Sequence, residues 1–291
     1  TPLIRMFEFN VESFPFKKYS NKQLASIPLT LLLVSILILG GWFLATGSPV
    51  NPGIEFTGGT EITLISDGGT DPIYSTFNWP IDSIRPIATQ TNAYIVTFQS
   101  STVQPEQLEL ASSNAGFEVL AVQSTSPSFG AESQTLALLG IMMAFIGMAI
   151  VVFFLFRKLV PSLAVVLSAL GDILIPLAIM NLLGIQLSLG TVAALLMLIG
   201  YSVDSDILLT NHILKRKGNF YESTYNAMRT GLTMTFTSLS AITVMTISSF
   251  LFGVDLLTSI GVVLIFGLLV DLLNTYLLNF SLLRWYVEGL Q

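Results

Sequence analysis

The sequence predicts an integral membrane protein in which six helices form a membrane bundle and carry one small external α+β domain of ferredoxin-like kind. The composition is the first reason: 52% of the 291 residues are hydrophobic and 10% are charged, whereas soluble chains average about 25% charged residues. Six apolar runs reach or nearly reach the roughly 20 residues that a helix needs to cross a bilayer. Between the first two runs, one long segment instead shows short strand-like stretches separated by glycine and proline.

The apolar runs divide the chain into spans and connections. We place the spans at residues 27–46, 135–156, 161–183, 189–210, 232–252 and 257–283. The segments outside them are 1–26, 47–134, 157–160, 211–231 and 284–291. Because the connections at 184–188 and 253–256 are too short for anything but helical hairpins, bulk outside the membrane is expected at 47–134 and 211–231.

The distribution of basic residues predicts the orientation. Of the 12 lysine and arginine residues, 11 fall before the first run or after the second, fourth and sixth: Arg5, Lys17, Lys18, Lys22, Arg157, Lys158, Lys215, Arg216, Lys217, Arg229 and Arg284. The positive-inside rule therefore predicts that both termini are cytoplasmic and that residues 47–134 are extracellular. The first run has a longer leader and a longer apolar core than a cleavable signal peptide, so we expect an uncleaved anchor.

The external segment has the pattern of a small α+β domain. We expect strands at 59–65, 93–98 and 117–122, with one helix between the last two. Pro105 suits the first turn of that helix, and Gly116 suits its end. Residues 66–92 contain several glycines and prolines and indicate an irregular excursion.

The external side is also acidic, through Glu55, Glu61, Asp67, Asp71, Asp82, Glu106, Glu109, Glu118, Glu132 and Asp255. This surface is typical of a soluble domain, and attraction of basic unfolded chains is the alternative.

Four carboxylates are the candidate functional residues. Asp172, Asp204, Asp206 and Asp271 lie within the apolar spans, where no lysine or arginine neutralises them. A charged aspartate near the centre of a span costs roughly 2.5 to 3.5 kcal/mol, so such a residue is a functional-site hypothesis by default. The four aspartates indicate a protein that moves or uses protons or ions.

The fourth span carries two of these residues in the sequence IGYSVDSD, residues 199–206. Asp204 and Asp206 are about 200° apart around a helix and cannot share one face. Ser202 lies on the side of Asp206, while Ser205 shares a stripe with Tyr201. The span is therefore polar around most of its circumference, and we expect it to be buried in the bundle or against a partner.

The fifth span adds a stripe of hydroxyl groups at helical spacing, formed by Thr230, Thr233, Thr237 and Ser240. The stripe could solvate a neighbouring carboxylate, or its members could hydrogen-bond across helices. His212 lies at the membrane edge beside basic residues and indicates an interfacial anchor. Asp271 could equally be a protonated acid that hydrogen-bonds a carbonyl group.

Other chemistries fit the sequence poorly. With no cysteine and one histidine, neither a thiolate site nor a histidine zinc site is predicted. Residues 204–206 match the start of a calcium loop, but the rest of that motif is missing. Presenilin-like proteases need Tyr-Asp and Gly-x-Gly-Asp pairs, which are absent around Tyr201 and Asp172. We predict no catalytic residues, no metal, no cofactor and no nucleic-acid partner.

Two motifs carry a resemblance to a known family. The sequence GIEFTGGT at residues 53–60 resembles the G-[IV]-[DE]-F-x-G-G-T signature of the SecD/SecF family of Sec translocon accessory proteins. The start of IGYSVDSD looks like the fourth span of SecF-type members, of archaeal kind. The Gly58-Gly59 pair suits a tight connection from a helix into the first strand. Since the span plan also matches, the resemblance covers essentially the whole chain.

The resemblance implies half of an RND-superfamily complex. It implies a SecD partner, contact with the Sec channel and with membrane lipids, and assistance to the export of unfolded polypeptides, which is linked to the proton-motive force in bacteria. Bacterial members usually place the membrane aspartate at the position of Ser205, flanked here by Asp204 and Asp206. Asp172 matches an aspartate found in many members.

Three functions remain open from the sequence. The first is a SecF-type subunit that couples export to ion movement through its aspartates. The second is a non-conducting scaffold that positions SecD and the channel, with the aspartates serving as buried hydrogen-bonding groups. The third, a half-size RND exporter of lipids or small molecules, needs a larger external pocket than residues 47–134 offer.

Overall fold

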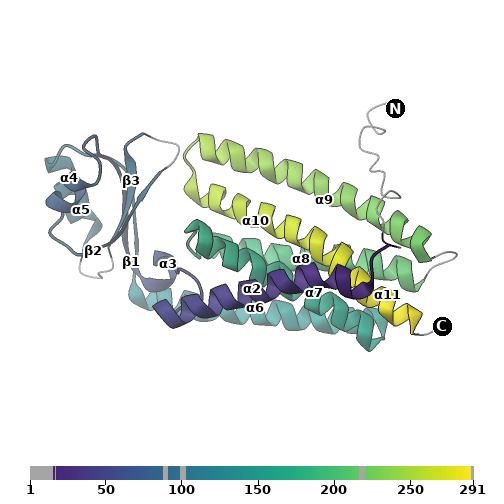
Figure 1. Cartoon of the computed structure of the whole chain (residues 1–291). Helices are drawn as coiled ribbons and strands as arrows, with labels where there is room; N and C mark the ends of the chain where they lie inside the picture. Colours follow the sequence, from purple (N-terminus) through teal and green to yellow (C-terminus); the bar gives the residue numbers. More distant parts are fainter. Residues whose placement is uncertain (1–15, 17, 88–90, 99–102, 216–219, 290–291) are drawn as a thin grey trace, which may run out of the picture.

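Long helices form a bundle, and a small sheet domain lies at one end of it (Figure 1). The computed structural model describes residues 16, 18–87, 91–98, 103–215 and 220–289. In these residues, six helices are long and apolar enough to cross a membrane. Four of the basic residues that predict the orientation, Arg5, Lys17, Arg216 and Lys217, lie outside the described residues.

The bundle places two helices at its centre. Its helices are α2 (Asn21–Thr46), α6 (Pro127–Phe156), α7 (Leu159–Leu183), α8 (Leu189–Leu214), α9 (Phe220–Leu251), α10 (Asp255–Leu273), the π-helix η2 (Asn274–Asn279) and α11 (Phe280–Glu288). In the apolar windows of α7 and α8, 61% and 56% of the residues are buried, against 11% in α6 and 17% in α9. The outer faces of α6 and α9 are therefore left for lipid or another subunit.

Local capping signals set several helix ends. Ser20 and Gln23 form a capping box at the start of α2, and Ser188 and Thr191 form another at the start of α8. Gly184 adopts a φ of 70° at the end of α7, which glycine tolerates without steric cost. The helices also continue beyond the apolar runs. Most of 211–231, the segment between the fourth and fifth predicted spans, is helical, because α8 runs to Leu214 and α9 begins at Phe220.

The small domain that lies outside the helix bundle, which we call the external domain for this position alone, has the predicted ferredoxin-like fold. Its elements are β1 (Gly59–Ile65), α4 (Asp71–Thr76), β2 (Ile81–Pro86), β3 (Ala93–Phe98), α5 (Pro105–Asn114) and β4 (Glu118–Thr125). The strand order is β2-β3-β1-β4, and all three pairs are antiparallel. Apolar side chains such as Ile62, Val96 and Leu108 fill the core between the sheet and its helices. Figure 1 shows α4 and α5 on the sheet face that points away from the bundle.

One prediction for this domain was wrong. Residues 66–92 are not an irregular excursion, because they contain α4 and the edge strand β2. The prolines misled the prediction: Pro72 lies in the first turn of α4, where its missing N–H costs nothing. Pro86 ends a strand at the sheet edge, where proline is also tolerated.

The connection into the domain uses the two adjacent glycines. A short helix, α3 (Ile54–Thr57), is followed by Gly58 and Gly59, with φ angles of 74° and 129°. A Cβ atom on Gly58 would lie 2.7 Å from Pro127, and one on Gly59 would lie 2.6 Å from the carbonyl oxygen of Phe98. Both conformation and space therefore require glycine at these positions.

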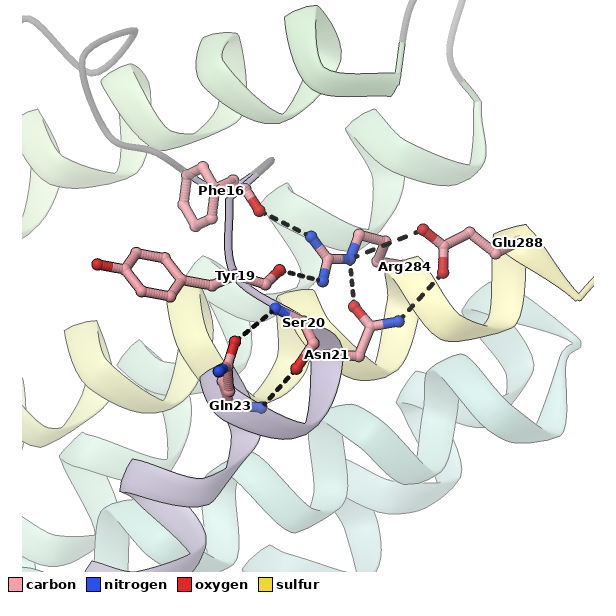
Figure 2. Close-up of polar contacts among 7 residues, drawn as sticks. All are labelled: Phe16, Tyr19, Ser20, Asn21, Gln23, Arg284 and Glu288. Carbon is pink, nitrogen blue, oxygen red and sulfur yellow. Dashed lines mark hydrogen bonds and ion pairs between the residues drawn. The ribbon is translucent and has the colours of Figure 1, made fainter.

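The chain preceding α2 is attached to α11 by a buried arginine (Figure 2). Arg284 donates hydrogen bonds to the carbonyl oxygens of Phe16 (2.9 Å) and Tyr19 (2.8 Å) and to the side chain of Asn21. Glu288 lies 3.8 Å from the guanidinium group. Arg284 is only 5% exposed, so this residue, counted among the basic residues that predict the orientation, is an interior structural group.

Candidate functional site: a buried carboxylate cluster

The structure brings three of the four predicted aspartates together. Asp172 of α7, Asp206 of α8 and Asp271 of α10 are each at most 1% exposed. Thr275 links Asp206 to Asp271, and Asp172 is held by donors from α8 and η2, the elements that also carry the donors to the other two. We call these three residues the carboxylate cluster. Among the described residues, none of the three forms an ion pair. Buried carboxylates without a cation are costly unless hydrogen bonds or protons compensate their charge.

Asp172 is held by donors from two other helices. Ser202 Oγ donates to Asp172 Oδ2 at 2.5 Å, and Asn274 Nδ2 donates to Asp172 Oδ1 at 2.7 Å. The Asn274 amide also lies 3.4 Å from the carbonyl oxygen of Ser168. The glycine before Asp172 makes room for this approach, because a Cβ atom on Gly171 would lie 2.6 Å from Asn274 Nδ2.

Two hydroxyl groups connect the other two carboxylates. Ser205 Oγ lies 2.9 and 3.1 Å from the two oxygens of Asp271 and 3.3 Å from Thr275 Oγ1. Thr275 Oγ1 lies 2.8 Å from Asp206 Oδ1 and 3.3 Å from Asp271 Oδ1. Asn279 Nδ2 donates to the same Asp206 oxygen at 2.8 Å. Since each hydroxyl carries one proton, Thr275 serves one carboxylate at a time.

A π-helix supplies the donors that the sequence prediction missed. Asn274, Thr275 and Asn279 all belong to η2, and each is at most 1% exposed. Short π-helical segments widen the helix turn and frequently occur at functional sites. Asn274 and Thr275 are three and four residues after Asp271, a spacing that places them on its face of the helix. The spacing from Asp271 could therefore have identified Asn274 and Thr275 from the sequence, whereas no sequence pattern indicated the π-helical turn.

The hydrogen bonding of the second carboxylate oxygen of Asp206 and of its neighbours is incomplete. Asp206 Oδ2, Asn279 Oδ1 and Thr210 Oγ1 are buried and have no hydrogen-bond partner among the described residues. Thr210 follows Asp206 by one helical turn, so these atoms belong to one region of the bundle. The described residues contain no group of three or more histidine, aspartate or glutamate side chains placed to hold a metal ion.

The other predicted site residues lie elsewhere. Asp204 is exposed on the outer face of α8 and is not part of the carboxylate cluster. Thr233, Thr237 and Ser240 are exposed on α9, where each hydroxyl donates to a carbonyl oxygen of its own helix. Tyr201 packs beside the apolar core, and its buried hydroxyl has no partner among the described residues.

Comparison with known proteins identifies the family. The family described as "Protein export membrane protein SecD/SecF, C-terminal" matches residues 106–289, and the SecD/SecF GG motif matches residues 43–64. The protein-export membrane protein SecF of Haloferax volcanii is 56% identical over 97% of this chain and 98% of its own length. The chain belongs to the SecF family. The Haloquadratum walsbyi SecF is 57% identical over the same shares of the two chains.

More distant relatives and a solved structure agree with this assignment. The SecF of Methanocaldococcus jannaschii is 40% identical over 90% of this chain and 94% of its own length. The crystal structure of SecDF, a translocon-associated membrane protein from Thermus thermophilus, superimposes with a TM-score of 0.73 at 21% identity. The match covers 96% of this chain and 40% of the SecDF chain. The fold class, a SecF-type membrane bundle with a small α+β domain, is thereby confirmed, and the chain is a multi-pass membrane protein.

Proposed function

We propose that this chain is the SecF subunit of a Sec translocase accessory complex that pairs with SecD and couples the movement of protons through the carboxylate cluster to protein export. In this proposal both termini are cytoplasmic and residues 47–134 face outward, where exported unfolded polypeptides emerge from the Sec channel. The observation that carries the proposal is the cluster itself: three buried carboxylates that form no ion pair with any described residue, two of them bridged by the hydroxyl group of Thr275.

The hydrogen bonding around Asp206 favours a protonatable site. Oδ1 of Asp206 accepts from Thr275 and Asn279, but Oδ2 has no donor among the described residues. A proton on Oδ2 would turn that atom into a donor in a region that holds unpartnered oxygens of Asn279 and Thr210. Each added or removed proton therefore changes which of these groups are satisfied. Buried charges there would also respond to the membrane potential, by about 2.3 kcal/mol per elementary charge and 100 mV.

The exposed position of Asp204 supports pairing with SecD. Asp204 lies ten residues before the end of α8, which is about 15 Å along the helix axis. A carboxylate at such depth is costly against lipid. A second membrane subunit on this face would remove that cost, and the family name of the relatives points to SecD as the subunit.

A scaffold is the second candidate function. The contacts of Ser202, Asn274 and Asn279 with the carboxylates would also fix neighbouring helices if no proton moved. In that case the cluster holds the bundle together, and the complex only positions SecD and the channel. The two functions differ in how export responds when the charges are removed while the complex is kept.

The test compares aspartates inside and outside the cluster. Asp172→Asn and Asp206→Asn keep the side-chain size and remove the charge, and Asp204→Asn is the matched control on the outer face of α8. Membrane vesicles containing the chain, SecD and the channel are assayed for export with and without a membrane potential, normalised to the amount of complex. We expect the potential-dependent part of export to be lost in the cluster variants and retained in the control.

The contrary result is equally clear. If the Asp172→Asn/Asp206→Asn double variant assembles normally and exports at the wild-type rate per complex, with unchanged proton flux, then coupling through the cluster is wrong. Export that tracks the amount of complex alone would establish the scaffold instead.

A further inference from the structure

The base of the external domain is joined to the loop between α7 and α8 by backbone hydrogen bonds. The N–H of Leu187 donates to the carbonyl oxygen of Asn51 at 2.7 Å, and the N–H of Gly53 donates to that of Leu187 at 2.8 Å. Pro52 and Leu187 form an isolated parallel bridge. A Cβ atom on Gly53 would lie 3.0 Å from the Leu187 carbonyl oxygen, so the two backbone segments are in close contact.

The end of α7 adds a side-chain connection to the same segment. Asn181 is 3% exposed; its amide donates to the carbonyl oxygen of Pro49 at 2.8 Å and accepts from the N–H of Asn51 at 3.3 Å. Trp42 of α2 donates to the Asn51 side chain at 2.9 Å. The segment that enters the external domain is thus fixed on the hairpin.

Glu55 extends this connection to the first residue of α8. Its carboxylate accepts a hydrogen bond from the N–H of Leu189, at the positive end of the helix dipole, where a negative charge is favourable. Glu55 belongs to α3, which leads through Gly58 and Gly59 into β1. One side chain therefore connects the external sheet to the helix that carries Ser202, Ser205 and Asp206.

The helix between these two points is uninterrupted. From Leu189 to Asp206, α8 contains no proline and spans about 26 Å at 1.5 Å per residue. In α7, by contrast, Pro176 lies between Asp172 and Asn181, and a proline inside a helix removes a hydrogen bond and favours a kink. Of the two helices, α8 is the stiffer connection between the carboxylate cluster and the external domain.

We infer that Glu55 is a positioning residue that transmits rearrangement of the carboxylate cluster, through α8, to the external domain. The inference rests on the proposed coupling function. It adds the structural connection through which a change in the carboxylate cluster would reach the external domain. A competing route exists through α6, where a Cβ atom on Gly130 would lie 2.8 Å from the backbone nitrogen of Gly58. The two routes make different predictions for variants of Glu55.

The experiment measures the position of the external domain directly. Since the chain has no cysteine, spin labels at Ser113→Cys in α5 and Val244→Cys in α9, both exposed, report one distance in the complex with SecD in lipid nanodiscs. Asp206→Asn serves as the mimic of the protonated state. Hydrogen exchange over residues 271–279 reports the cluster independently of the external domain.

We expect Asp206→Asn to shift the label-to-label distance in the otherwise wild-type chain, and Glu55→Ala to abolish the shift while the change in hydrogen exchange remains. Glu55→Gln, which keeps an acceptor oxygen, should retain part of the shift and covers the case that Glu55→Ala does not fold. Glu109→Ala, an exposed acid on α5, is the matched control and should leave the shift intact.

Two outcomes overturn the inference. A shift that persists undiminished in Glu55→Ala assigns transmission to the α6 route. A change in hydrogen exchange without any distance shift, in any background, means that nothing is transmitted. Neither outcome bears on the export assay of the Asp206→Asn variant, so failure of this inference and failure of the proposed function are separate results.

Discussion

The interior of the bundle and its outer faces hold the same kinds of polar residue in opposite settings. Asp206 is fully buried and accepts two hydrogen bonds from η2, whereas Asp204, two residues earlier in the same helix, is exposed. Ser205 contacts a carboxylate of another helix as well as the carbonyl oxygen of Ser202 in its own, while Ser240 bonds the carbonyl oxygen of Phe236 within its own helix. The role of a polar residue in an apolar span therefore depends on whether it lies on a buried or an exposed face of its helix. Interior groups should control the chain itself, and outer groups should control what the chain binds.

The largest difference is expected between a buried and an exposed cation. Arg284→Ala removes the guanidinium group that donates to the buried carbonyl oxygen of Phe16 and to the partly buried one of Tyr19. Because hydrogen bonds to charged groups are worth about 1.5 to 3 kcal/mol, we expect a loss of roughly 3 kcal/mol in the free energy of unfolding, measured by SDS titration in mixed micelles. Lys215→Ala, at an exposed position, should change it by less than about 0.5 kcal/mol. Equal losses of unfolding free energy in the two variants would show that the buried position of Arg284 does not make it more important for stability than an exposed lysine.

Two helical glycines give the next contrast, and here the signs differ. A Cβ atom on Gly171 would meet Asn274, whereas one on Gly200, on the outer face of α8, would have nothing within 4 Å. Overpacking costs about 1 to 3 kcal/mol, so Gly171→Ala should destabilise the chain and disturb the donor to Asp172. Gly200→Ala should stabilise it by about 0.5 to 1 kcal/mol, the usual gain within a helix. Thermal unfolding in detergent measures both, and destabilisation by Gly200→Ala would place a neighbour on that face.

A smaller effect separates two serines. Ser205→Ala removes a hydroxyl that lies within hydrogen-bonding distance of both oxygens of Asp271 and can donate to either one, and an unsatisfied buried acceptor costs about 1 to 3 kcal/mol. Ser240→Ala removes an exposed hydroxyl whose hydrogen-bond partner among the described residues is the carbonyl oxygen of Phe236 in its own helix, so a change below about 0.5 kcal/mol is expected. The same unfolding titration measures the pair. Matching losses would indicate that the α9 hydroxyls are structural after all.

Periodicity predicted the fold better than it predicted the site. Apolar length alone identifies six spans, and alternation identifies β1, β3 and β4 of the external sheet. The missed elements, α4 and β2, contain Pro72 and Pro86, whose tolerance depends on first-turn and edge positions that a sequence does not reveal. A local sequence pattern therefore predicts secondary structure well when the effect of a residue does not depend on its position in the fold, and poorly for residues such as proline, whose effect does.

The site required information from several helices at once. The sequence showed that Asp204 and Asp206 lie on opposite faces, but not which face is covered, because that depends on how α7 and α10 pack against α8. Asp271 had no assigned role until the structure placed Ser205 beside it. Asn274 and Asn279 were missed because amides in an apolar run attract less notice than carboxylates, although they complete the hydrogen bonding of Asp172 and Asp206.

The smallest effect on the chain itself should come from the outer face, and it is the most informative about the partner. Asp204→Leu removes an exposed carboxylate, so the free energy of unfolding of the isolated chain should change by less than about 0.5 kcal/mol. The amount of the Asp204→Leu variant that copurifies with SecD should fall, because the polar group that SecD would cover is no longer present. Asp204→Asn, which keeps a polar side chain, should copurify normally. A loss above 1 kcal/mol without SecD would mean that Asp204 is an interior residue, and undiminished copurification of Asp204→Leu would move the SecD contact to another face of the bundle.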